Sequence, residues 1–132
     1  MTDRPIAKKL PARAPGATFP SVRTLPDLQV ATLDAQGRLA LRSAATTMCW
    51  QPHDPVTLTV RDGVLRLTDP TISMAGLAVL LDSRCRVQLP YGIRTATGLE
   101  PGARLMIVAA PHEGVVAALA VSRVVAAFAA RP

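Results

Sequence analysis

Two pairs of oppositely charged residues recur at the same spacing along this chain of 132 residues. Asp34 precedes Arg38 in LDAQGRLALR, and Asp82 precedes Arg86 in LDSRCRVQLP. A carboxylate at the start of a turn can accept hydrogen bonds from later backbone N–H groups or from the guanidinium itself. We therefore predict that both aspartates are structural turn residues. The arginines either bind an anion or serve only as ion pairs that close their loops.

The charge balance favours an anionic partner. The net charge is +6 and the isoelectric point about 10.7. Nucleic acid is the most frequent partner of such a chain, and membrane headgroups are an alternative. From residue 26 onward every basic residue is arginine. Arginine forms planar, two-pronged hydrogen bonds to phosphate and guanine, although a genome rich in arginine codons would give the same bias.

Side chains suited to catalysis or metal binding are sparse. Cys49 and Cys85 form no CxxC motif, and His53 and His112 lie in turn-like stretches beside prolines. No cluster has the ligand spacing of a zinc site, so we expect no metal and no cofactor. Because no second acid, activated nucleophile or paired base accompanies Asp34 and Asp82, we do not expect an enzyme.

Cys85 lies between Arg84 and Arg86. Two neighbouring cations would lower the pKa of a thiol and favour the reactive thiolate. The sequence therefore raises redox sensing at Cys85 as a speculative role.

The chain shows no secretory or membrane-spanning pattern. The N-terminus lacks the apolar run of a signal peptide. Residues 114–130 are apolar, but Arg123 interrupts them and the stretch is short for a bilayer span. We expect a cytoplasmic protein with free thiols, associated with the nucleoid and not with a membrane.

Residues 1–26 differ in composition from the rest. They hold five of the twelve prolines, interspersed basic residues and no apolar period. Such a segment buries too little surface to offset its ordering entropy, so we predict a disordered basic arm. Lys8, Lys9 and Arg13 would then contact DNA nonspecifically, and the alternative is an inert tail.

Short apolar runs separated by turn signals begin at residue 28 and predict a mainly β fold with short helices. The Asp62–Gly63 pair predicts a tight hairpin turn because both positions tolerate positive φ. Pro90 and Gly98 are placed to start and end a short helix, and Ser122 to cap a final one. The predicted strands are 28–33, 38–41, 56–60, 64–67, 77–81, 86–89, 104–109 and 115–121. The predicted helices are 43–49, 90–98 and a C-terminal helix, about 122–130.

An internal repeat connects the two charged turns. An offset of 48 residues superposes Asp34 on Asp82 and Arg38 on Arg86, and an offset of 49 superposes Trp50 on Leu99. Repeat 1 covers about 28–69 and repeat 2 about 76–121. At the first offset, Arg42 matches Pro90 and Thr46 matches Arg94.

A single repeat has too few strands to be stable alone. Two repeats can interleave around a common core and remove exposed sheet edges. We therefore predict one pseudo-twofold domain over 27–132, with Trp50 and Leu99 in its core.

The second repeat, DSRCRVQLPYGIRTATGLEPGARLMIV, resembles the AbrB/MazE/SpoVT swapped-hairpin DNA-binding domain. That family carries an Asp, a GR, an alternating strand ending in Pro, an I-R and a GL-x-PGD. Two tandem copies in one chain are similar to the arrangement in MraZ. The resemblance implies a swapped-hairpin β-barrel formed by the two repeats, followed by the C-terminal helix.

The resemblance also implies a function and its residues. It implies a transcriptional regulator that binds double-stranded DNA through Arg38, Arg86 and Arg94. Arg42 and Arg84 are further candidates for DNA contact, which the family pattern itself does not supply. The chain departs from the pattern where Cys85 replaces the glycine of GR and where PGA replaces PGD. The second repeat is the closer match, so we expect the stronger DNA contacts there.

Two other functions stay open. The first is an antitoxin with a toxin as its protein partner, although only a short segment follows the last predicted strand. The second is a protein-interaction barrel that no longer binds DNA. A homodimer joined through the final helix also stays open.

Overall fold

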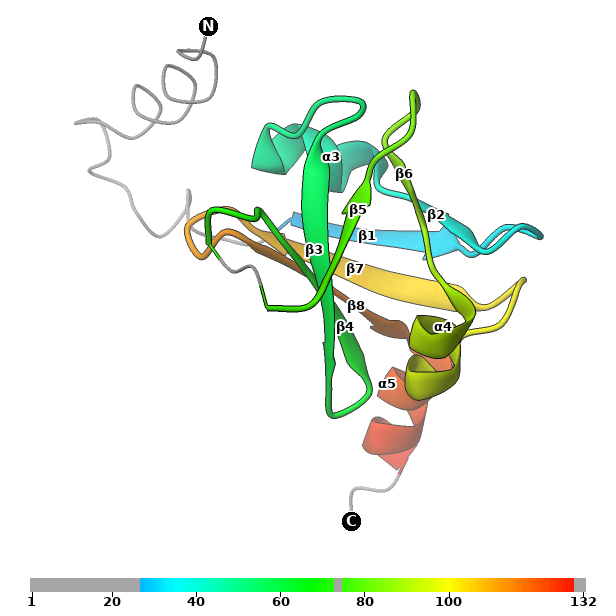
Figure 1. Ribbon diagram of the computed structural model, residues 1–132. Coiled ribbons are helices and arrows are strands. Elements are labelled where there is room, and N and C mark those ends of the chain that lie inside the picture. Colours follow the sequence, from blue (N-terminus) through cyan, green and yellow to red (C-terminus); the bar gives the residue numbers. More distant parts are fainter. Residues whose placement is uncertain (1–26, 73–74, 130–132) are drawn as a thin grey trace, which may run out of the picture.

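The computed structural model describes residues 27–72 and 75–129, and this part of the chain is mainly β (Figure 1). The arm predicted for residues 1–26, with Lys8, Lys9 and Arg13, lies outside the described residues. The strands are β1 (Asp27–Thr32), β2 (Arg38–Ala40), β3 (Pro55–Arg61), β4 (Val64–Thr68), β5 (Leu77–Leu80), β6 (Arg86–Gln88), β7 (Arg104–Ala110) and β8 (Val115–Ala120). The helices are α3 (Arg42–Met48), α4 (Tyr91–Thr97) and α5 (Val121–Ala129).

Six strands form an antiparallel sheet whose order reflects the internal repeat. The order is β1–β7–β8–β4–β3–β5, and exchanging the repeats turns it into its own reverse. The first strand of each repeat pairs with the long strand of the other, β1 with β7 and β5 with β3. The predicted interleaving of the two repeats is therefore confirmed.

The sheet is nevertheless open. β1 and β5 lie at its two ends, and each pairs on one side only within the described residues. The expectation that interleaving removes exposed edges is wrong, because the exchanged strands themselves become the edges. Figure 1 shows the sheet strongly bent, with β1, β7 and β8 crossing behind β5, β3 and β4.

β2 and β6 form a second, two-stranded antiparallel ladder, one strand from each repeat. Its central pair, Leu39 and Val87, is fully buried in the same cluster as Leu58, Leu65 and Ile107 of the sheet. The ladder therefore covers the inner face of the sheet, and its own outer face is turned to solvent. Trp50 and Leu99 are both buried, as predicted.

Different interactions set the ends of the two short helices. α3 has no side-chain cap of its own, but the Gln29 side chain of β1 accepts a hydrogen bond from the Ala44 N–H at 3.1 Å. α4 follows Pro90 and ends at Gly98, whose φ is 72°. The Pro90 and Gly98 positions are those predicted from the sequence.

The hairpin between β3 and β4 is the predicted tight turn. Arg61 pairs with Val64, which leaves Asp62 and Gly63 as the two central residues. Their φ values are 54° and 79°, the double positive φ that an Asp-Gly turn supplies. Two residues are enough to connect β3 and β4, because the backbone twist of such a turn matches the twist of the two strands.

The last helix differs from its prediction. α5 begins at Val121, directly after β8, so Ser122 lies in its first turn and is not its N-cap. None of the side chains of residues 121–129 is buried, and Phe128 is 70% exposed. The helix therefore does not close the core. Arg123 instead donates a hydrogen bond from Nη1 to the Asp62 carbonyl at 3.2 Å.

The two repeats differ by one residue just before their helices. Leu41 and Leu89 make equivalent bonds, from their N–H groups to the carbonyls of Cys85 and Gly37. α3 starts directly after Leu41, whereas Pro90 stands between Leu89 and α4. Pro90 is therefore the inserted residue, and its predicted match with Arg42 is wrong.

Candidate nucleic-acid interface

The first charged turn is held by the carboxylate of Asp34. Its Oδ1 accepts hydrogen bonds from the backbone N–H groups of Gln36 at 2.9 Å and Arg38 at 2.8 Å. Its Oδ2 accepts one from Nε of Arg38 at 2.9 Å. Nε of the Arg38 guanidinium is thus taken by Asp34, and Nη2 donates to the Gln36 side chain at 3.1 Å. Nη1 makes no hydrogen bond with the described residues and can bind an anion.

The second turn repeats this geometry. Oδ1 of Asp82 accepts bonds from the N–H groups of Arg84 and Arg86, each at 2.8 Å. Oδ2 accepts Nε of Arg86 at 2.8 Å. Cys85 has a φ of 56° where Gly37 has 78°, so the substituted cysteine keeps the left-handed conformation of the glycine.

The ladder places the two arginines on one face. Arg38 pairs with Gln88, Leu39 with Val87 and Ala40 with Arg86. Since Leu39 and Val87 point into the core, the alternate residues on both sides of them point outward. Arg38 and Arg86 are diagonal neighbours on this outer face, a spacing of about 7–8 Å between backbones in a typical sheet.

Arg94 lies at the Arg38 end of the ladder, although the two residues belong to different repeats. A Cβ built on Gly37 would lie 3.3 Å from Nε of Arg94. Nε of Arg94 donates to the Leu89 carbonyl at 3.1 Å, and its guanidinium lies 5.8 Å from the centroid of the Tyr91 ring. The structure therefore places Arg94 beside Gly37, the residue before Arg38.

The predicted counterpart of Arg94 is also wrong. The cap residues Cys49 and Gly98 bond to the carbonyls of Ala45 and Arg94, respectively. Arg94 thus corresponds to Ala45, which is buried, and not to Thr46. The reason is again the inserted Pro90, which shifts the helix by one position.

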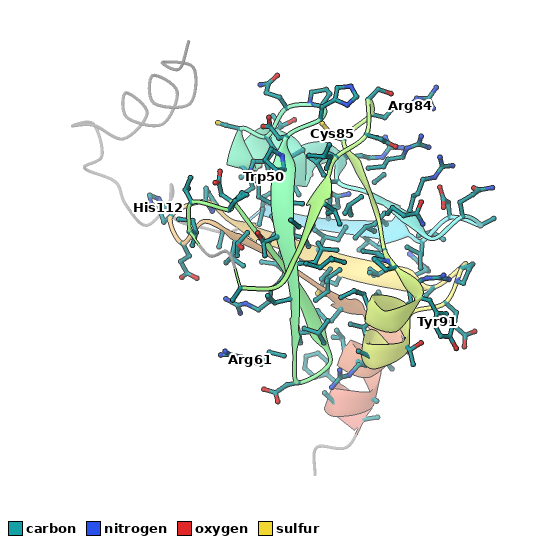
Figure 2. The ribbon with its side chains drawn as sticks, in the orientation of Figure 1. Trp50, Arg61, Arg84, Cys85, Tyr91 and His112 are labelled. Atoms are coloured by element: carbon teal, nitrogen blue, oxygen red, sulfur yellow. The ribbon has the colours of Figure 1, made fainter. Side chains whose placement is uncertain are left out.

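Arg84 and Arg42 are exposed and, unlike Arg38 and Arg86, are not held by an aspartate in the described part of the chain. Neither side chain makes a hydrogen bond or ion pair with another residue that the structure describes. Figure 2 shows Arg84 projecting outward from its turn. Arg84 belongs to the Arg86 turn, and Arg42 opens α3 shortly after β2.

The turn geometry changes the acidity of both aspartates. Chiefly the backbone N–H of Arg38, aided by its guanidinium, holds the pKa of Asp34 below its usual value. Burial pushes the pKa of Asp82 upward, but the N–H groups of Arg86 and Arg84 and the Arg86 guanidinium together lower it. Both carboxylates therefore stay ionised and keep their arginines in place at neutral pH.

Cys85 is less acidic than its neighbours suggested. Burial raises the pKa of its thiol, and the nearby carboxylates of Asp54 and Asp82 raise it further. The predicted lowering by Arg84 and Arg86 is wrong, because the thiol packs against the core while the Arg84 side chain points outward. The redox speculation loses its basis, and both cysteines are free thiols.

The sequence did not identify three further residues at the Arg38 end. Nε2 of Gln88 donates to the Gln36 carbonyl at 2.6 Å, and the Gln36 side chain accepts Nη2 of Arg38 at 3.1 Å. Tyr91 lies beside Arg94 and is 75% exposed. The period-two pattern of β6 could have placed Gln88 outward, but only the strand pairing reveals its partner.

Other kinds of site have little support in residues 27–72 and 75–129. Over these residues no group of three or more His, Cys, Asp or Glu side chains could hold a metal ion. No helix in the same residues is long and apolar enough to cross a bilayer.

Comparison with known proteins assigns no family. No protein-family model matches the chain, and no curated protein matches it.

Proposed function

We propose that this protein is a double-stranded DNA-binding transcriptional regulator of the AbrB/SpoVT type, and that the outer face of the β2–β6 ladder is its DNA-binding surface. The observation that carries the proposal is the pair of matching turns. Each fixes one arginine by its Nε edge, and the ladder presents both on one outward face. A fixed, planar donor suits a phosphate or a guanine edge.

The strand exchange supports the same proposal. In a swapped-hairpin barrel, each copy of the unit completes the sheet of the other, as β1 with β7 and β5 with β3 do here. We propose that the open, bent sheet and its ladder are a single-chain version of that barrel. The basic arm would add nonspecific affinity.

The direct test is DNA binding by the Arg86→Ala variant. Duplexes selected from random DNA at moderate salt would be titrated against both proteins by fluorescence anisotropy. The variant should bind about 5- to 150-fold more weakly, the roughly 1–3 kcal/mol expected for one well-placed arginine. If Arg86 binds a phosphate, its removal should also reduce the slope of log affinity against log salt by about 0.9.

Arg66→Ala is the matched control, because it removes the same charge elsewhere. Arg66 is exposed on β4, between the buried Leu65 and Leu67, and so faces away from the core and the ladder. Its loss should leave affinity nearly unchanged. Equal binding by wild-type protein and Arg86→Ala, with both folded by circular dichroism, would refute this site.

One observation favours a second candidate, a module that binds another protein. Val125 and Phe128 of α5 are 59% and 70% exposed. An apolar helix face of this kind suits a toxin partner or a second copy of the chain. Failure of the wild-type protein to bind any duplex in a salt-dependent way would favour this candidate over the regulator.

A further inference from the structure

The two ends of the ladder carry different side chains at equivalent positions. We call Gln36, Arg38, Gln88 and Arg94 the reading end, and Arg42, Arg84 and Arg86 the holding end. The repeat relation matches Arg38 with Arg86, but it matches Gln88 with Ala40 and Arg94 with the buried Ala45. Gln36 is matched by Arg84. The surface is therefore pseudo-symmetric in its backbone and asymmetric in its chemistry.

The side chains of the reading end are fixed in place. Arg38 is bound on two sides, by Asp34 at 2.9 Å and by the Gln36 side chain at 3.1 Å. Gln88 is tied to the Gln36 carbonyl. Arg94 is held by the Leu89 carbonyl and by the Tyr91 ring, a cation–π contact. Side chains ordered in advance lose little entropy on binding, which suits the narrow geometry of base recognition.

Gly37 makes this arrangement possible. A side chain there would begin 3.3 Å from both Nε of Arg94 and Nε2 of Gln88, closer than ordinary van der Waals contact. At the other turn Cys85 occupies the equivalent position, where Ala45 and Ala40 replace Arg94 and Gln88. The glycine and the polar side chains thus belong to one end, and the cysteine and the alanines to the other.

The holding end is built differently. Only Arg86 is fixed, by Asp82, whereas Arg84 and Arg42 are exposed and unpaired within the described residues. The Leu81 N–H donates to the Asp54 carbonyl at 2.9 Å, which places an acidic residue beside this turn. The equivalent bond at the reading end joins Leu33 to Ala103. Exposed arginines that no neighbour orients suit phosphates, whose contacts position a protein on the duplex without reading its sequence.

We infer that the protein binds a non-palindromic DNA site in one orientation, with the reading end contacting base edges and the holding end contacting phosphates. Arginine and glutamine are the side chains that pair with guanine and adenine in the major groove. The reading end offers two of each, drawn from both repeats. This inference rests on the proposed function and assigns the stronger recognition to the Arg38 end, not to the second repeat as a whole.

The test is selection of bound duplexes from random DNA by three proteins at the same salt concentration. Wild-type protein should enrich a non-palindromic motif. Arg94→Lys keeps the charge but loses the planar fork, so it should lose the preference at one side of the motif. The Arg42→Ala/Arg84→Ala double variant should keep the motif and bind all duplexes more weakly. Its salt slope should fall by about 0.9 for each phosphate that is no longer neutralised.

A pair of glycine variants separates the fit of Arg94 from backbone strain. Gly37→Ala should relax the motif as Arg94→Lys does, because the methyl group displaces Arg94. Gly98→Ala has a similar positive φ, 72° against 78°, but a Cβ there meets nothing within 4 Å. It should therefore keep the full motif while incurring a similar conformational cost.

The outcomes distinguish this inference from the proposed function. A palindromic motif, or uniform weakening by Arg94→Lys with no change of motif, would overturn binding in one orientation and leave DNA binding intact. Absence of salt-dependent binding by the wild-type protein would overturn both. Thermal unfolding of each variant shows whether its fold is retained.

Discussion

The Asp-x-x-x-Arg turn keeps its geometry in two different sequences. The loops share Asp, Arg and the following strand, yet Gly37 in one is Cys85 in the other. A left-handed conformation costs a residue with a side chain about 1–2 kcal/mol. Cys85 still adopts it, because the Asp82 carboxylate bonds to the N–H groups on either side of it and the thiol packs against the core.

At this scale, folding stability should depend on pH through Asp34 and Asp82. Each has a lower pKa folded than unfolded, so its contribution is complete above the unfolded pKa of about 3.9 and is lost as the pH falls through the folded pKa. The urea midpoint should therefore fall as the pH is lowered from about 5 to 3. The Asp34→Asn/Asp82→Asn double variant should be less stable at pH 6 and show a shallower decline.

Asp69→Asn is the control for the pH experiment. Asp69 also accepts hydrogen bonds in a turn, from the Thr71 N–H and hydroxyl, but it has no arginine partner among the described residues. Its variant should retain the wild-type pH profile. Identical pH profiles for wild-type protein and the double variant would show that the two turn carboxylates do not contribute to acid sensitivity.

Among the helices and strands, the sequence predicts which elements form better than it predicts where each one begins. Short apolar runs between turn signals located all eight strands, and Pro90 and Gly98 located α4 within one residue. The start of α5 was wrong because β8 continues directly into the helix without the turn that a Ser122 cap presumes. The helix alignment was wrong because the sequence does not show whether the extra residue lies before or within α4.

α5 should contribute little to stability. Its side chains over residues 121–129 are not buried, so Phe128→Ser should change the free energy of unfolding by less than about 0.5 kcal/mol. Leu65→Ala, at a fully buried position in β4, should cost about 2–5 kcal/mol. Urea denaturation of both variants measures the contrast.

A large loss of stability in Phe128→Ser would mean that the helix packs against something in solution. Sedimentation of the wild-type protein and this variant at several concentrations would then identify a second copy of the chain as that partner. Unchanged stability and a concentration-independent mass agree with a peripheral helix.

In the molecule as a whole, the two repeats interleave their strands. Each supplies an edge strand to the other's hairpin and one strand to the ladder. This was predictable in outline, since the repeat is visible in sequence and a single copy lacks strands. The open edges and the position of Arg94 beside the Arg38 turn were not predictable, because both depend on which strands pair across the repeats.

Neither repeat should therefore fold alone as a monomer. A fragment of residues 27–72 loses the partner strands of β1 and β2 and one of the two partners of β3 and of β4. It should show no cooperative unfolding by circular dichroism at low concentration. At high concentration it should gain structure by pairing with another copy of itself, because β1 occupies the place of β5. A fragment that is a folded monomer at all concentrations would show that one repeat does not need the strands of the other.

The pairing of strands between the two repeats also matters while the chain is being synthesised. β1 is synthesised early, but its partner, β7, follows after both charged turns and both short helices. Forming such distant pairings is slow, since the entropy of the intervening loop must be lost before the strands can bond. Until β7 is made, the backbone hydrogen-bonding groups of β1 that face β7 are unpaired, and strands of other chains could bind them. Slowing the ribosome between β4 and β5 should therefore lower the yield of native protein, whereas the same delay after β8 should not.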